Sequence, residues 1–302
     1  MIEVHELTKV YGDKAAVRNL SFTVRPGRVT GFLGPNGAGK TTTLRMLLGL
    51  VAPTGGTAIV DGRPFAHRPR GLRHVGALLD AGDVHGGRGA ASHLRALARS
   101  NGIPRGRVAE VLGEVGLTEV ARQRAGGFSL GMRQRLGIAT ALLGDPPVLL
   151  FDEPLNGLDP EGVLWVRGLF RRLAEQGRTV FVSSHLMSEM ENTADDLVVI
   201  GRGELIAAES LTDFAARGTR LSVTVRTPDA AALTELLTAE GAAVHAGDGR
   251  LTVTGLPAAR IGELAFRHRL MLHELATRTA SLEDAFMELT ADSVEYLAGE
   301  SR

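Results

Sequence analysis

The sequence predicts an α/β protein with a mixed sheet, an inserted helical subdomain and a smaller α+β sandwich domain at its C-terminal end. Three observations support this prediction. A glycine-rich loop at Gly34–Thr41 joins an apolar strand to a helix. Apolar strands and amphipathic helices then alternate up to about residue 215, and a new series of strands and helices begins after Gly218. We therefore expect one domain over residues 1–215 and another over residues 216–302.

The first domain opens with short apolar strands that are separated by Gly, Pro and Asn turns. From about residue 82 to residue 145 the apolar spacing becomes helical, which predicts the inserted subdomain. Further strands then alternate with helices, as in parallel β-α-β units. The expected strands are Ile2–Leu7, Leu20–Val24, Val29–Leu33, Thr57–Val60, His74–Leu79, Val148–Phe151, Thr179–Ser183 and Leu197–Ile200, and the later helices are Pro160–Gln176 and Leu186–Ala194.

The C-terminal part has the order strand, helix, strand, strand, helix, strand, which predicts a small sandwich of helices on a sheet. A last helix, Leu282–Leu289, carries apolar residues on one face, and Ser281 stands where a helix cap would lie. The expected ranges before that helix are Arg220–Arg226, Asp229–Glu240, Ala243–Ala246, Arg250–Thr254, Ala258–Arg269 and Met271–Leu275.

Composition limits the classes of protein that fit. The chain has 302 residues, of which 44% are hydrophobic, so it can bury one large core and one smaller core. Lys and Arg number 34 and so do Asp and Glu; because the charges balance, we expect no nucleic-acid partner. There is no cysteine for a disulfide or a thiolate metal site. We find neither a signal peptide nor an apolar run near the roughly 20 residues of a membrane-spanning helix.

The loop has the pattern of a phosphate-binding site. Its glycines let the backbone curl so that N–H groups converge on phosphate oxygens at the start of a helix. Lys40 would reach the β- and γ-phosphates, and the Thr41 hydroxyl would hold Mg²⁺. The alternative is a glycine-rich turn with a chance lysine, but the flanking strand and helix favour a nucleoside triphosphate site. The expected binding residues are Gly34, Pro35, Asn36, Gly37, Ala38, Gly39, Lys40, Thr41 and Thr42.

A second chemical signal lies where the strand Val148–Phe151 ends in two carboxylates, Asp152 and Glu153. If this strand lies beside the phosphate loop, Asp152 can hold Mg²⁺ directly or through water. Glu153 can then polarise a water molecule aligned with the γ-phosphorus. The alternative is a solvated acidic turn after a strand, which the neighbouring phosphate loop makes less favoured.

Five motifs, in this order, resemble those of the nucleotide-binding subunits of ATP-binding cassette (ABC) transporters. The resemblance covers roughly residues 2–215 and implies a P-loop NTPase fold of the ABC ATPase type that hydrolyses ATP with Mg²⁺. The motifs are Gly34–Thr42, Phe128–Arg135 ahead of a helix, Phe151–Pro154, Gly157–Pro160 and Ser183–His185.

The resemblance also implies roles for single residues. Ser129 and Gly131 match the family's signature sequence, and Asp159 matches its D-loop. His185 matches the switch histidine that faces the γ-phosphate, and Tyr11 matches the aromatic residue that stacks on adenine. Simpler alternatives exist: Tyr11 as a packed edge-strand aromatic, His185 as a surface residue at a helix start, and Ser129 as a helix cap.

Two departures from the family pattern stand out. Asp80 occupies the position, after the strand that leads into the helical subdomain, where the family usually has glutamine. Asp80 can either bind Mg²⁺ or its water, as a further metal ligand, or point to solvent. Leu130 and Met132 replace the more frequent glycine and glutamine of the signature. This variant, and the closing segment Thr279–Thr290, resemble the branch of bacitracin-, lantibiotic- and drug-export ATPases.

The resemblance implies partners as well. One chain carries one phosphate loop and one signature segment, and in the family these act across a dimer interface, so we expect a homodimer with composite ATP sites. The expected function is the ATPase subunit of an exporter for a drug or antibiotic peptide, with a separate membrane permease. The expected location is the cytoplasmic face of the cell membrane, or the cytoplasm when unassembled. Alternatives are an importer-type ATPase, a soluble non-transport ABC ATPase and a catalytically silent regulatory cassette.

Overall fold

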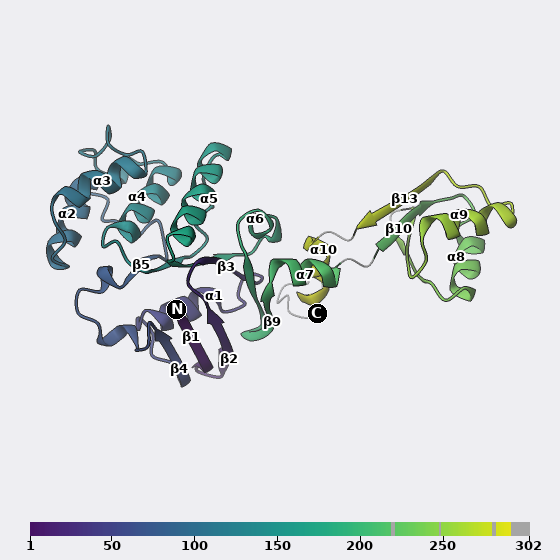
Figure 1. Cartoon of the computed structure of the whole chain (residues 1–302), viewed down its shortest axis with the longest axis horizontal. Coiled ribbons are helices and arrows are strands. Elements are labelled where there is room, and N and C mark those ends of the chain that lie inside the picture. The colour runs from purple at the N-terminus through teal and green to yellow at the C-terminus, as the bar shows by residue number, and fades with distance from the viewer. Residues whose placement is uncertain (219–220, 248, 280–281, 291–302) are drawn as a thin grey trace, which may run out of the picture. The chain divides into compact units, whose positions relative to one another are not determined.

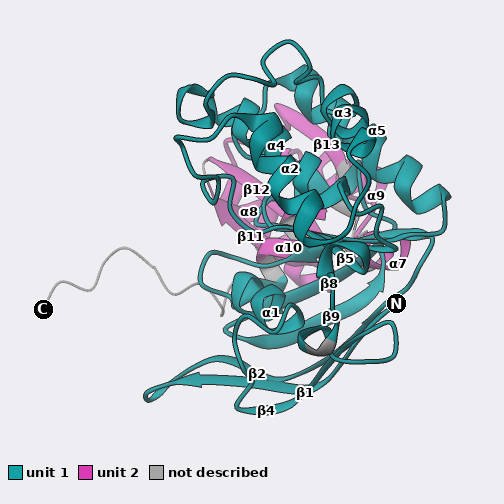
Figure 2. Cartoon of the chain, turned by 90° about the vertical axis from the view of Figure 1, so that its left-hand side faces the viewer, with its two compact units in different colours: residues 1–211, 289–302 teal, residues 212–288 magenta. Residues whose placement is uncertain are grey.

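The computed structural model describes residues 1–218, 221–247, 249–279 and 282–290. The chain divides into two compact units, which Figure 2 colours separately. Unit 1 contains Met1–Leu211 and, from the last helix, Leu289 and Thr290; unit 2 contains Thr212–Glu288. The division thus falls between Leu211 and Thr212, whereas the sequence predicted it after residue 215.

The centre of unit 1 is a six-stranded sheet with the order β5-β6-β7-β3-β8-β9. All neighbouring pairs are parallel except β8 with β9. Strand β3 lies between β7 and β8, so the carboxyl ends of β3, β6 and β7 meet at one edge, where ligands of such sheets bind. The strands are β3 (Arg28–Leu33), β5 (Val75–Leu78), β6 (Val148–Phe151), β7 (Thr179–Ser184), β8 (Asp196–Gly201) and β9 (Glu204–Ser210).

A second, antiparallel sheet of unit 1 has the order β2-β1-β4. Its strands β1 (Ile2–Tyr11) and β2 (Lys14–Val24) form a longer hairpin than the sequence predicted, because their pairing continues across register shifts that break the simple apolar alternation. Strand β4 is Gly55–Val60. The rings of Phe22, Phe32 and Phe181 pack with centroids 5.0 to 5.7 Å apart and join the two sheets in one core.

The helices of unit 1 lie where the apolar spacing predicts them, and α2, α3 and α4 form the inserted helical group (Figure 1). The helix predicted at Leu186–Ala194 is shorter than expected, because α6 covers only Met187–Glu191. No helix in the described ranges is long and apolar enough to span a membrane. The helices are α1 (Lys40–Leu47), α2 (Ala90–Ser100), α3 (Gly106–Glu114), α4 (Leu130–Leu142), α5 (Pro160–Glu175) and α6, with short 3-10 turns at Phe65–His67, Gly71–Arg73 and Ala125–Gly127.

Unit 2 contains an antiparallel sheet with the order β11-β12-β10-β13, and apolar side chains of α8 and α9 fill its core. The last strand was predicted at Met271–Leu275 but begins at Glu274. Its limits are set by pairing with β10, in which Glu274 lies opposite Arg226 and Thr279 lies opposite Leu221. The predicted cap Ser281 lies outside the described residues. The elements are α7 (Leu211–Gly218), β10 (Leu221–Arg226), α8 (Ala230–Ala239), β11 (Ala243–Gly247), β12 (Arg250–Thr254), α9 (Ala258–Arg267), β13 (Glu274–Thr279) and α10 (Leu282–Thr290).

Candidate active site

The predicted phosphate loop joins β3 to α1. Gly37 and Gly39 have φ values of 83° and 103°, which favour glycine. A Cβ atom on Gly39 would lie 2.5 Å from the carbonyl oxygen of Ala16, so no larger residue fits there. Unlike α4 and α5, helix α1 has no side-chain cap. Its first-turn N–H groups and its positive dipole end therefore suit an anion such as phosphate.

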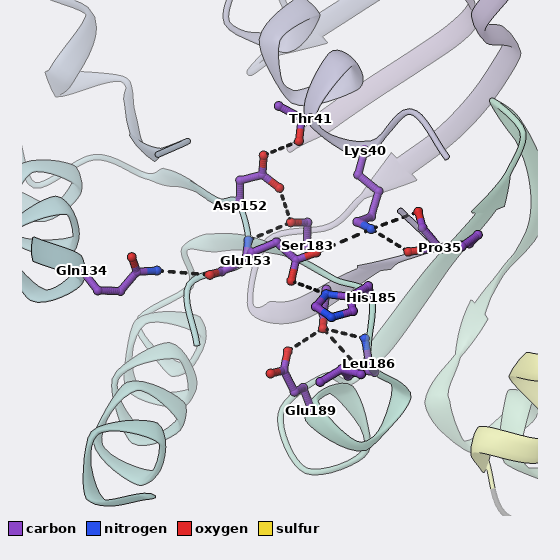
Figure 3. A network of polar contacts seen from close by, with 12 residues as sticks. Pro35, Lys40, Thr41, Gln134, Asp152, Glu153, Ser183, His185, Leu186 and Glu189 are labelled. Carbon is purple, nitrogen blue, oxygen red and sulfur yellow. Dashed lines mark hydrogen bonds and ion pairs between the residues drawn. The ribbon is translucent and has the colours of Figure 1, made fainter. Parts of the chain in front are cut away.

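Lys40 places its ammonium group over this loop. The side chain is only 7% exposed, and Nζ donates to the carbonyl oxygens of Gly34, at 2.5 Å, and Pro35, at 3.4 Å. Nζ also lies 3.5 Å from Oε1 of Glu153 (Figure 3). Burial lowers the pKa of Lys40 below its usual value, and the charges of Glu153 and Asp152 oppose this effect. Phosphate oxygens at this position would offer the ammonium a further counter-charge.

Asp152, at the end of β6, lies between the phosphate loop and β7. Its Oδ2 accepts a hydrogen bond of 2.6 Å from the Thr41 hydroxyl, and its Oδ1 accepts one from the Ser183 hydroxyl. The parallel pairing of Phe151 with Val182 brings Asp152 and Ser183 side by side. A hydroxyl and a carboxylate are hard oxygen donors, the kind that Mg²⁺ prefers, so Thr41 and Asp152 fit the predicted metal.

Glu153 leaves the strand in the left-handed region, with φ 47°. Its N–H donates to the Ser183 hydroxyl at 2.9 Å, and its carboxylate Oε2 lies 2.9 Å from Nδ1 of His185. Figure 3 shows Glu153, Lys40 and His185 gathered at one point. A carboxylate held between an ammonium and an imidazole can accept a proton from water while its neighbours stabilise negative charge.

The loop that carries His185 is held by a buried hydroxyl. Ser184 donates to Oε2 of Glu189 at 2.5 Å and accepts a hydrogen bond from the Leu186 N–H at 3.0 Å. Burial raises the pKa of the Glu189 carboxyl, and the charge of Glu153 adds to this rise, while the hydrogen bond from Ser184 opposes it. No pattern in the sequence singles out Glu189, because a carboxylate in a short helix is ordinary surface composition.

Some predicted residues lie at the site's surface. Tyr11 ends β1 with its side chain 50% exposed and with Nζ of Lys9 at 4.9 Å from its ring centroid, so it is not a packed edge-strand aromatic. Asn36 is exposed and Ala38 is buried in the phosphate loop. Thr42 follows Thr41 in the first turn of α1. The half-exposed Tyr11 ring is thus open to stacking with a nucleobase.

Other predicted residues act locally as caps. Ser129 is the N-cap of α4 and accepts from the Met132 N–H at 3.2 Å, and Asp159 is the N-cap of α5 and accepts from the Gly162 N–H at 2.8 Å. Gly131 is the second residue of α4. Within the described part of the chain, no hydrogen bond or ion pair joins Ser129 or Asp159 to the phosphate loop.

Asp80 follows β5 and is exposed to solvent. Its Oδ1 accepts a hydrogen bond of 2.6 Å from the Gly82 N–H, so the carboxylate closes its own turn. Among the described residues, Asp80 makes no hydrogen bond or ion pair with Thr41 or Asp152. This geometry corresponds to the solvent-facing alternative, and a metal role for Asp80 stays a prediction.

The strand, phosphate loop and helix, with a carboxylate-bearing strand at the same sheet edge, define a P-loop nucleoside triphosphatase. The family model described as ABC transporter matches residues 17–156. The chain is also 35% identical to the uncharacterized ABC transporter ATP-binding protein YhcH of Bacillus subtilis (strain 168), over 98% of this chain and 97% of that protein. The chain therefore belongs to the ABC transporter family and is an ATP-hydrolysing subunit of it.

Further relatives match about two thirds of the chain. The bacitracin transport ATP-binding protein BcrA of Bacillus licheniformis is 43% identical over 68% of each chain. The lantibiotic transport ATP-binding protein SrtF of Streptococcus pyogenes is 35% identical over 68% of this chain and 89% of that protein. A solved structure of the ATP-binding subunit of an ABC transporter aligns with a TM-score of 0.66 and 26% identity, over 72% of this chain and 92% of that one. The model of a domain of unknown function matches residues 221–283.

Proposed function

We propose that this chain powers the export of a peptide antibiotic or a similar compound through a separate membrane permease. The observation that carries this proposal is the similarity of the chain to BcrA and SrtF, whose names state bacitracin and lantibiotic transport. Leu130 and Met132 in the signature segment support the same assignment. In this arrangement the chain sits at the cytoplasmic face of the membrane, bound to the permease.

The proposal includes a homodimer with two composite ATP sites. Ser129 and Asp159 are exposed and lie outside the hydrogen-bond network of their own phosphate loop. Ser129 and Asp159 are the N-caps of α4 and α5, and the positive end of the α4 dipole favours an anion near Ser129. Two copies related by two-fold symmetry would each present this surface to the nucleotide on the phosphate loop of the other.

We assign roles within each site from the contacts described above. Lys40 and the α1 amides bind the phosphates of ATP, and Tyr11 stacks on its adenine. Thr41 and Asp152 hold Mg²⁺, which supplies charge neutralisation at the phosphates when it is bound. Glu153 takes a proton from the attacking water, and His185 keeps the Glu153 carboxylate oriented toward the γ-phosphate.

The role of Glu153 gives a direct prediction. Glu153→Gln should lower ATP turnover by roughly 10²–10⁴-fold, the usual contribution of a general base, because the amide cannot take the proton. ATP affinity, measured by equilibrium binding, should stay near that of the unchanged protein. Full ATP turnover in this variant would show that another residue is the general base.

The proposed transport function can be tested by identifying the membrane protein that binds this chain. We would purify the tagged chain from gently solubilised native membranes and identify the proteins recovered with it by mass spectrometry. A polytopic membrane protein in near-equal amount is the expected result. Recovery of the chain only in the soluble fraction, alone or with ribosomes or DNA, would contradict the proposal and favour a soluble non-transport ATPase.

A further inference from the structure

Gln134, in the second turn of α4, makes a polar contact with the end of β6. Its side chain is 4% exposed, and Nε2 donates a hydrogen bond of 3.1 Å to the carbonyl oxygen of Glu153 (Figure 3). Gln134 lies within the motif Phe128–Arg135, but nothing in that motif indicated this contact. An amide that is buried in this way costs free energy unless it is paired, so the contact specifies where α4 packs.

The carbonyl that Gln134 binds belongs to the residue whose backbone leaves the strand in the left-handed region. The N–H of the same residue is held by Ser183, so both polar groups of the Glu153 backbone have a partner from a different element. The Glu153 carbonyl oxygen also accepts a hydrogen bond of 3.3 Å from the Asn156 N–H within its own turn. Together these hydrogen bonds fix the peptide planes on either side of the Glu153 Cα atom. They thereby set the direction in which the carboxylate leaves the chain.

Two close approaches join α4 to the same segment a few residues later. A Cβ atom on Gly157 would lie 2.2 Å from Cδ2 of Leu130, so the Leu130 side chain contacts this glycine. A Cβ atom on Gly131 would lie 3.2 Å from the Gly157 carbonyl oxygen. The start of α4 therefore packs on the chain that follows Glu153 and leads to Asp159.

We propose that Gln134 is a positioning residue for ATP hydrolysis, which holds the Glu153 backbone so that its carboxylate stays beside Lys40 and His185. Because α4 also carries Ser129 and Gly131, the same hydrogen bond joins the signature segment to Glu153 of its own subunit. This second step rests on the proposed homodimer. In that dimer, the signature segment of one subunit would close over the nucleotide bound to the other subunit. Gln134 would transmit this movement to Glu153 of its own subunit.

The test compares Gln134→Met, which keeps the length of the side chain and removes its N–H donors, with Gln176→Met. Gln176 is exposed at the end of α5, away from the site. ATPase rates measured against ATP concentration should show kcat about tenfold lower for Gln134→Met, with KM within about twofold of the unchanged protein. Gln176→Met should match the unchanged protein. A rise in KM at unchanged kcat would overturn the proposal.

A second measurement separates positioning from a general structural effect. In a Glu153→Gln background, Gln134→Met should lower the residual rate by less than about twofold, because the carboxylate that it positions is gone. Losses that multiply in the double variant would overturn the proposal. If Gln134→Met does not fold, Gln134→Leu, which is also apolar and has no N–H to donate, should give the same selective fall in kcat. Full kcat in that folded variant would overturn the proposal.

The dependence of the ATPase rate on ATP concentration is a separate test of whether two paired ATP sites act together. A cooperative dependence in the unchanged protein that becomes hyperbolic in Gln134→Met supports the transmission step. A hyperbolic dependence already in the unchanged protein would contradict both the paired sites and the transmission step. The kcat comparison would still test the positioning role in that case.

Discussion

Asp152 and Glu153 are neighbours in the chain, but they have different surroundings. Asp152 is 8% exposed and is bound by two hydroxyls, whereas Glu153 is 22% exposed and faces an ammonium and an imidazole. A carboxylate bound by hydroxyls suits a metal ion, and one that lies beside an ammonium and an imidazole suits water activation. The different roles that we propose for these two residues follow from these contacts.

Glu189 gives a prediction about pH. Its folded-state pKa is raised, chiefly by burial, so the folded protein holds this proton more tightly than the unfolded chain does. The contribution of Glu189 to stability is therefore largest at acid pH and falls as the pH rises through the raised pKa. Glu189→Gln removes this decline and keeps an oxygen to accept from Ser184. The variant's Tm, relative to the unchanged protein, should increase from about pH 4 to about pH 8.

Thermal unfolding across this range measures the difference. Glu191→Gln is a suitable control, because it removes an exposed carboxylate from the same helix. A difference in Tm between Glu189→Gln and the unchanged protein that does not change with pH would contradict a titrating, buried Glu189.

Candidate site residues could be predicted from the sequence where they lie in short contiguous motifs. Lys40, Thr41, Asp152 and Glu153 lie in short motifs, and the structure brings them together. The contacts of Ser183 and Gln134 could not be predicted, because they depend on which residues face each other across β6 and β7 and on how α4 packs. Such contacts join residues up to 31 positions apart and leave no local pattern.

At the scale of elements, the approach of α4 to β5 depends on a missing side chain. A Cβ atom on Gly76 would lie 1.9 Å from the Ala141 carbonyl oxygen. Gly76→Ala should therefore push α4 and β5 apart and cost about 1–3 kcal/mol, the usual range for overpacking. At 2–4 °C per kcal/mol for a unit of this size, Tm should fall by several degrees.

Gly168→Ala is the matched control. Gly168 lies in α5, and a Cβ atom there meets nothing within 4 Å. Alanine favours a helix over glycine by up to about 1 kcal/mol, so Tm should stay or rise slightly. A loss of stability as large as that of Gly76→Ala would show that close packing is not the cause.

Element types were easier to predict than element bounds. Apolar runs such as Val148–Phe151 predicted buried parallel strands, and the structure has them. The last strand of unit 2 was misplaced because Met271 and Leu272 look like strand residues, but Met271 is 60% exposed and pairing with β10 decides the register. Register depends on the partner strand, which local sequence does not contain.

For the whole molecule, the proposed homodimer predicts that hydrolysis depends on protein concentration. Each site would need Ser129 and Gly131 of the other copy, so turnover per subunit should fall when the protein is diluted into the monomeric range. The measurement is specific ATPase activity against protein concentration, with the mass of the species followed in parallel. Constant turnover per subunit in monomers would contradict the composite site.

The backbone of Glu153 has a consequence for selection. A residue other than glycine in the left-handed region costs roughly 1–2 kcal/mol, so the fold would be more stable with glycine at this position. Glycine would remove the carboxylate that we assign to hydrolysis. If variants were selected only for thermal stability, Glu153→Gly should therefore be favoured, and ATP turnover should fall. The protein retains at this position a local instability that thermal selection opposes and that the proposed role of Glu153 requires.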